Sequence, residues 1–217
     1  MSLFDKTGTL TEDGLVYMGV LTNFDENVSS KIPAGSRLEE TLAVCHSLTR
    51  INNEICGDPL DIEMFGATGW KLVEPEVPEE ENVDSFELTF VERDQGQCRI
   101  LQLRQFPFSS ENARQTLIGQ CHYGNEEKEL VSFIKGAPEK VMKLCDPETV
   151  PTNFGQKLDQ LSAKGYRIIA LAHKPLKIKR WKALKADRRS LEENAKFLGR
   201  HSLHYQQINY LLQINDR

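Results

Sequence analysis

The sequence predicts an α+β fold in which helices pack on an antiparallel sheet. Three observations lead to this fold class: capped helical periods before residue 74, alternating apolar and polar residues from 87 to 135, and helix signals followed by a strand signal from 138 to 173. The chain has 217 residues, 39% of them hydrophobic. It is therefore long enough to bury one good-sized core.

Two helices are expected first along the chain. The segment SRLEETLAVCHSL offers Ser36 and Glu39 as a capping box, followed by apolar residues at helical spacing. The segment DPLDIEMFGATGW places Asp58 at the N-cap and Pro59 at the first helical position. An acidic, proline-containing stretch at 74–82 then predicts a solvated loop.

Two hairpins of one antiparallel sheet are expected next. Residues 87–106 and 114–135 alternate in polarity, and each segment carries Gly, Asn or Asp near its midpoint. Helices are expected at 138–145 and 153–164, with Gly165 as the stop signal of the second one.

A strand at 166–173 completes the predicted elements. The tail, residues 200–217, has aromatic and leucine residues but no clear period and no capping signal. We therefore expect this tail to pack weakly.

Composition excludes several functional classes. The net charge of −5 provides no overall basic field for nucleic acid or an anionic membrane. The five cysteines are scattered without a C-x-x-C spacing, which favours a reducing cytosolic environment over disulfides or zinc. Cys45 and His46 lack further ligands at a recognisable spacing, so burial or exposure is expected for them rather than metal coordination. No segment approaches the ~18 apolar residues that a membrane-spanning helix needs.

The stretch LFDKTGTLTEDGL near the N-terminus is the strongest chemical signal. It places Asp5 after apolar residues and before a loop of glycine and threonines, where backbone N–H groups and hydroxyls can surround a phosphoryl group. Since a carboxylate is a poor nucleophile towards an anionic phosphate, such a site requires Mg²⁺. The alternative is an ordinary surface turn, because Asp, Gly and Thr are common turn residues.

Five motifs resemble those of the P-type ATPases. DKTGTLT at 5–11 is similar to the phosphorylation signature of that family. The further motifs occur in family order and are similar to parts of its nucleotide-binding domain: GDPLD at 57–61, FPFSS at 106–110, KGAPE at 135–139 and KGYRIIALA at 164–172. The resemblance covers most of residues 3–199. The sequences of these motifs are most similar to those of the type-five branch, which transports polyamines or cations.

The resemblance implies ATP and Mg²⁺ as ligands and assigns a role to each matching residue. Asp5 would be the phosphorylated residue, and Asp5 and Thr7 would contact the metal. The nucleotide site would be formed by Asp61 near the adenine amino group, Phe108 stacked on adenine, Arg114 as a further basic group, Lys135 lining the pocket, and Arg167 at the phosphates or ribose.

Structural alternatives exist for three of these residues. Phe108 could be a core or hairpin-edge aromatic. Lys135 could be an exposed lysine at a strand end. Asp61 could serve only to stabilise the N-terminus of its helix, where carboxylates are favoured.

Thr7 separates two related chemistries. In haloacid-dehalogenase-like phosphatases, an aspartate at the corresponding place acts as general acid and base during hydrolysis of the acyl phosphate. A threonine cannot do so at pH 7, which favours a longer-lived aspartyl phosphate, as a pump requires. The alternatives are a nucleotide-binding module that does no chemistry and, less favoured, a soluble phosphatase.

The resemblance also implies a domain organisation. Residues 1–15 would supply the first strand and loop of a haloacid-dehalogenase-like α/β phosphorylation domain, and 16–190 the nucleotide-binding domain. Residues 191–199 would return towards the phosphorylation domain, before the divergent tail at 200–217. Residues 1–15 are expected to pack weakly, like the tail, whereas about 20–190 should fold as a unit.

The family's remaining motifs are not found in this chain, so a truncated piece of a pump is expected. Its partners would be ATP and the phosphorylation, actuator and transmembrane domains of the parent, and not nucleic acid. The parent would lie in an endosomal or lysosomal membrane with this portion facing the cytosol. The piece alone would bind ATP without acting as a pump.

Overall fold

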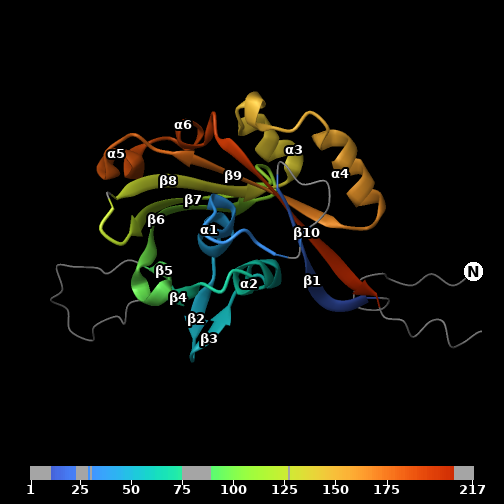
Figure 1. The fold of residues 1–217 in the computed structure, drawn as a ribbon, viewed down its shortest axis with the longest axis horizontal. Helices are drawn as coiled ribbons and strands as arrows, with labels where there is room; N and C mark the ends of the chain where they lie inside the picture. The colour runs from blue at the N-terminus through green and yellow to red at the C-terminus, as the bar shows by residue number, and fades with distance from the viewer. Residues whose placement is uncertain (1–10, 23–28, 30, 75–88, 127, 208–217) are drawn as a thin grey trace, which may run out of the picture.

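The computed structural model describes residues 11–22, 29, 31–74, 89–126 and 128–207. Its main feature is a long twisted sheet with helices on both faces (Figure 1). The sheet has eight strands in the order β1-β10-β9-β8-β7-β6-β5-β4, and every neighbouring pair is antiparallel. The predicted antiparallel sheet flanked by helices is confirmed.

The elements have the following bounds. The strands of the large sheet are β1 (Thr11–Thr22), β4 (Lys71–Val73), β5 (Phe90–Arg93), β6 (Cys98–Ser109), β7 (Arg114–Tyr123), β8 (Glu129–Gly136), β9 (Arg167–Pro175) and β10 (Lys196–Gln207). A separate hairpin joins β2 (Thr49–Ile51) and β3 (Glu54–Cys56). The α-helices are α1 (Arg37–Val44), α2 (Pro59–Gly66), α3 (Pro138–Val141), α4 (Phe154–Ala163), α5 (Arg180–Lys185) and α6 (Arg188–Glu192). Single 3-10 turns occupy Asp94–Gly96, Met142–Leu144 and Pro147–Thr149.

The sheet separates two hydrophobic layers. Leu117 of β7 packs in a cluster with α1 and α2 residues, whereas its neighbour Ile118 packs with Ala183 of α5 and Leu191 of α6. Successive strand residues point to opposite faces, so one strand serves both layers. In Figure 1, α3 to α6 lie along the upper side of the sheet, and α1 and α2 lie on the other.

Local sequence accounts for the predicted helices. The Ser36 hydroxyl accepts a hydrogen bond from the Glu39 backbone N–H at 3.2 Å, and the Asp58 carboxylate accepts one from Leu60 N–H at 2.8 Å. The Glu39 side chain accepts from the backbone N–H of Gly35, one residue before the expected partner, at 2.8 Å. Gly165 follows α4 with φ of +82°, a conformation that glycine adopts without steric cost.

The two predicted hairpins are confirmed by their register. In the first, Arg93 of β5 lies opposite Cys98 of β6, and in the second Cys121 of β7 lies opposite Glu129 of β8. The helix expected at 138–145 is shorter, because α3 ends at Val141 and continues as a 3-10 turn. The acidic stretch at 74–82 lies, apart from Glu74, outside the described residues.

At both ends that were expected to pack weakly, residues 11–15 and 200–207 belong to paired strands. Leu15 of β1 lies opposite Tyr205 of β10, and β10 in turn pairs with β9. The tail thus lies between two strands, where its backbone N–H and C=O groups are satisfied by the ladder rather than exposed at an edge. The described part of the N-terminal segment is antiparallel to its neighbour. Among the described residues, no helix combines the length and the apolar character required to cross a bilayer.

Candidate functional site

Four strand ends bring most of the predicted site residues to one end of the sheet. β6 ends just after Phe108, β7 begins at Arg114, β8 ends just after Lys135, and β9 begins at Arg167. Because these four consecutive neighbours are antiparallel, the ends of β6 and β8 lie beside the starts of β7 and β9. Strand pairing therefore brings residues that are far apart in the sequence to the same end of the sheet.

The centre of this end is an ion pair between Lys135 of β8 and Asp61 of α2. Lys135 Nζ donates a hydrogen bond to Asp61 Oδ1, and the two residues are 74 positions apart. Both residues are only 5% exposed. A buried charge pair is costly to assemble unless hydrogen bonds complete it, and Asp61 Oδ2 also accepts from the Ser47 backbone N–H at 3.3 Å.

These positions decide two of the structural alternatives. Lys135 is buried, so it is not an exposed lysine at a strand end. The N-cap of α2 is Asp58, which leaves Asp61 in the first turn with its carboxylate directed to Lys135. Phe108 is 61% exposed, which excludes a core role and leaves its ring open to a ligand or to solvent.

Three polar side chains that sequence reasoning did not select are linked to the pair through Ser47, whose backbone N–H contacts Asp61. Gln105 Nε2 donates to the Ser47 hydroxyl at 2.6 Å and to the His46 carbonyl at 3.0 Å. Gln115 Nε2 donates to the same hydroxyl at 3.0 Å. Gln115 is buried, whereas Gln105 is exposed. The place of Gln115 in a strand beside apolar residues is the only sequence signal that could have indicated a buried polar group.

His46 is neutral in this environment. Burial lowers its pKa to about 3, and the nearby Lys135 cation acts in the same direction. His46 Nδ1 accepts a hydrogen bond from Leu48 N–H at 3.1 Å, so the proton of the neutral ring resides on Nε2. That Nε2 has no hydrogen-bond partner among the described residues, although the ring packs edge-to-face against Phe65 with centroids 5.1 Å apart. Cys45 beside it is also buried, and burial raises the pKa of its thiol to about 12, which makes it unreactive.

Arg114 faces the other layer of the molecule. Its guanidinium donates to Glu192 Oε2 at 2.7 and 3.0 Å, and Glu192 of α6 is completely buried. Arg188 donates to the other carboxylate oxygen at 2.7 Å, and the Thr116 hydroxyl donates to it as well. Burial alone would raise the Glu192 pKa, but the hydrogen bonds from Arg114, Arg188 and Thr116 outweigh burial and lower it. The structure does not bring the Arg114 side chain together with Lys135.

The remaining predicted residues have more distant places. Arg167 is exposed at the start of β9, four positions before Leu171, which lies opposite Lys135. Asp5 and Thr7 lie outside the described residues. Within the described part of the chain, no group of three His, Cys, Asp or Glu side chains is arranged to hold a metal ion.

The described end of the sheet can therefore hold a polar, planar ligand more readily than a metal. It contains a buried pair of cation and anion, an enclosed neutral imidazole, the carboxamides of Gln105 and Gln115, and the exposed aromatic ring of Phe108. Such groups recognise the edges and the face of a heterocycle.

The family model and the relatives that match this chain point to the same protein family. The family described as P-type ATPase, cytoplasmic domain N, matches residues 86–204. Mouse polyamine-transporting ATPase 13A3 is 36% identical over 90% of this chain, and human polyamine-transporting ATPase 13A2 is 38% identical over 80%. Chicken probable cation-transporting ATPase 13A4 is 39% identical over 90% of the chain. The aligned part is 18%, 16% and 17% of those proteins, so the chain spans less than a fifth of their length.

Proposed function

The chain belongs to the P-type ATPase family, and we propose that it binds ATP at the end of the sheet where Lys135 and Asp61 meet. The observation that carries this proposal is the buried pairing of those two residues at the end of the sheet where β6 also ends, just after the exposed Phe108. A buried charge pair contributes little to stability compared with apolar residues of similar volume. Stability alone therefore does not explain why the pair is there, whereas binding of a ligand would.

Each residue has a proposed contact with the nucleotide. Phe108 would stack on the adenine ring, Asp61 would accept from its amino group, and Lys135 would line the pocket between base and phosphates. Arg167, whose forked guanidinium suits phosphate oxygens, would contact the phosphates or the ribose.

Arg114 has a different place in the proposal. It could reach a nucleotide only by releasing Glu192, which Arg188 and Thr116 would continue to hold. Its first effect is therefore to fix the start of β7, next to Gln115, and any contact with nucleotide would be secondary.

Phosphoryl transfer is proposed for a longer protein that contains this chain. There an Asp5 carboxylate oxygen would attack the γ-phosphorus of ATP, forming the aspartyl phosphate while ADP leaves. Mg²⁺, when bound, would neutralise the charge between carboxylate and phosphate. Asp5 and Thr7 are the proposed ligands in this chain, with residues 1–15 as part of a haloacid-dehalogenase-like domain. Within the described residues, no group of His, Cys, Asp or Glu side chains is arranged to hold that metal.

The proposed cargo rests on the names of the relatives, and the proposed location rests on the resemblance of the motifs to the type-five branch. Two of them are called polyamine-transporting and a third a probable cation-transporting ATPase, so we propose a polyamine or cation as the transported substrate. The parent would be a membrane pump of endosomes or lysosomes, with this portion in the cytosol and the phosphorylation, actuator and transmembrane domains as its partners. This chain alone would bind ATP without transporting anything.

Calorimetric titration of the chain with ATP tests the proposal. Phe108→Ala should weaken binding by about 1–3 kcal/mol, by analogy with aromatic stacking on nucleic-acid bases. Phe108 suits this test because its ring is mostly exposed, and the fold should tolerate its removal. The matched control is Ile51→Ala, an exposed apolar residue of the separate hairpin, 55% accessible. Equal affinities for the wild type and the Phe108 variant would remove the stacking assignment.

Phosphoryl transfer is tested separately with γ-labelled ATP and Mg²⁺. The chain alone should take up no hydroxylamine-sensitive label, and a longer protein should take it up at Asp5. Label on the isolated chain that disappears in Asp5→Asn would contradict the proposed need for other domains.

A further inference from the structure

A strongly basic surface surrounds α5 on the face opposite the proposed nucleotide site. The segment 174–189 contains eight of the chain's 27 basic residues and one acid, Asp187, although the whole chain has a net charge of −5. The basic residues are Lys174, Lys177, Lys179, Arg180, Lys182, Lys185, Arg188 and Arg189. A local field of this sign is opposite to the average charge of the protein.

Internal ion pairs do not account for most of these cations. Lys174 caps carbonyl groups near the end of α6, at 2.6 and 2.7 Å, and Arg188 and Arg189 pair with glutamates of α6 and the following residue. Among the described residues, no carboxylate forms a salt bridge with any of the other five. Those five are Lys177, Lys179, Arg180, Lys182 and Lys185, which are all exposed.

Large apolar side chains are exposed among the same cations. Trp181 is 56% accessible, and Ile178 and Leu184 are each 39% accessible. The Lys182 ammonium lies over the Trp181 ring, 5.5 Å from its centroid. The α5 helix is held to the sheet through Ala183, which is fully buried against Leu191 and Ile118. The helix is thus fixed in place while its tryptophan faces outwards.

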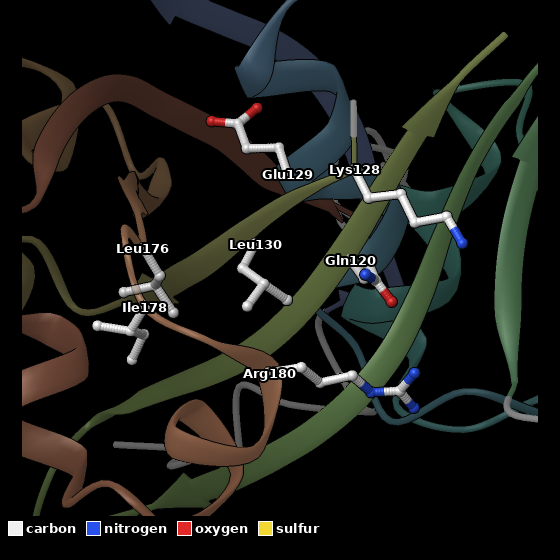
Figure 2. A pocket seen from close by; sticks show the side chains of 7 residues that line it. All are labelled: Gln120, Lys128, Glu129, Leu130, Leu176, Ile178 and Arg180. Carbon is white, nitrogen blue, oxygen red and sulfur yellow. The ribbon is translucent and has the colours of Figure 1, made fainter. Parts of the chain in front are cut away.

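Two recesses, each of about 380 Å³, adjoin this surface and share Leu176 and Ile178 as the ridge between them. Figure 2 shows the first recess, with Leu176 and Ile178 on one side, Arg180 and Lys128 on the other, and Leu130 between them. The second recess has Leu191 and Leu176 in its lining and Lys174, Lys177 and Lys182 around them. None of the predicted nucleotide residues lines either recess.

We propose that this surface, called the α5 face and formed by 176–185 with its two recesses, binds an acidic peptide segment of a partner protein. The peptide would place aliphatic or aromatic side chains in the recesses and its carboxylates against the five cations. The complementarity is of two kinds at once, apolar and electrostatic. Tryptophan and arginine are also the residues that most often dominate the binding energy of protein interfaces.

The same features favour a peptide over an anionic membrane. A bilayer presents a broad surface, so it would meet Trp181 but leave the recesses on both sides of the ridge unfilled. It would also experience the field of the whole chain, whose net charge is negative. A short peptide responds mainly to charges within a Debye length of ~8 Å, and these are positive at the α5 face.

The test uses the full chain and a fluorescein-labelled peptide in which leucine and phenylalanine are interspersed among glutamates. Fluorescence anisotropy should show saturable binding that weakens as salt is raised. Emission from Trp181 should shift to shorter wavelength on binding, and Trp181→Phe should remove this shift because Trp70 is only 4% exposed. The same peptide with glutamine in place of glutamate should bind at least about tenfold more weakly.

Charge-reversal variants locate the site. Lys177→Glu with Lys182→Glu should reduce peptide affinity about tenfold or more, and Ile178→Ser should reduce it by about threefold. The matched controls are the exposed residues Lys71 and Lys143, both changed to Glu, and Ile55→Ser in the separate hairpin. All controls should stay within about twofold of the wild type.

Four outcomes would overturn the proposal. They are absence of peptide binding, equal losses in the control variants, a Trp181 shift with phosphatidylserine-containing vesicles but not with the peptide, and self-association of the chain in sedimentation that depends on Trp181.

Discussion

Changing Asp61 to Asn removes the anion from the buried pair and leaves the Lys135 cation 5% exposed without its partner. Breaking a buried ion pair from one side costs about 3–5 kcal/mol, because the remaining charge is neither solvated nor compensated. In a chain of this length each kcal/mol lowers the melting temperature by about 2–4 °C. The expected fall is therefore about 6–20 °C.

A thermal melt followed by circular dichroism measures this fall, and a second variant separates the charge from the packing. Adding Lys135→Met to Asp61→Asn removes the unpaired cation and should recover part of the loss, so the two changes will be non-additive. A single Asp61→Asn variant that melts within about 2 °C of the wild type would refute the reasoning. It would mean that the two side chains are solvated rather than buried together.

Three further predictions concern pH and packing. Because the folded pKa of Glu192 is lowered, its ionised form stabilises the fold above the ordinary glutamate pKa of 4.5, and this stability is lost as pH falls through the lowered value. The stability difference between wild type and Glu192→Gln in urea titrations should thus be largest near pH 7 and shrink below pH ~4, and a difference independent of pH would contradict it. His46 has a folded pKa of about 3 against 6.5 in the unfolded chain, so the unfolded state binds the extra proton between these values and stability should fall with decreasing pH by about 1.4 kcal/mol per unit. His46→Gln should reduce that slope by about one proton, and an unchanged slope would show that the ring is protonated in the fold. A Cβ added at Gly136 would lie 2.5 Å from the Ala113 carbonyl oxygen and 2.6 Å from Arg114 Cβ, so Gly136→Ala should cost about 1–3 kcal/mol in chemical denaturation, whereas Gly155→Ala, with open space around it, should cost less.

Local signals in the sequence were sufficient for most of the fold. Ser36, Asp58 and Gly165 mark helix ends through contacts with residues two or three positions away, and the hairpins arise from neighbouring segments. Such interactions are visible in a short window of sequence. They explain why the central strands and the first helices were predicted correctly.

The outer strands and α5 could not be predicted from short windows of sequence. β10 pairs with β1, and the sequence of the tail alone does not indicate this distant partner. The register of β10 also shifts between Phe197 and Gly199. Such an irregularity interrupts the alternation that marks a strand. The six-residue α5 has no side-chain cap, so it leaves no start signal.

The site was predictable only in part for the same reason. Residue types at Asp61 and Lys135 suggested a pocket through family resemblance, but their contact joins residues 74 positions apart. Arg114 has its partner, Glu192, 78 positions away, and no local pattern indicates that its side chain faces the other layer. His46 and Gln115 became site candidates only when the fold placed them beside Lys135.

Backbone amide chemical shifts, recorded while ATP is added to the isotopically labelled chain, test the central claim most directly. We expect the largest changes at the ends of β6 and β8, the start of β9 and the first turn of α2, around Phe108, Lys135, Arg167 and Asp61. Saturation without changes at that end of the sheet, or with changes confined to the α5 face, would contradict it.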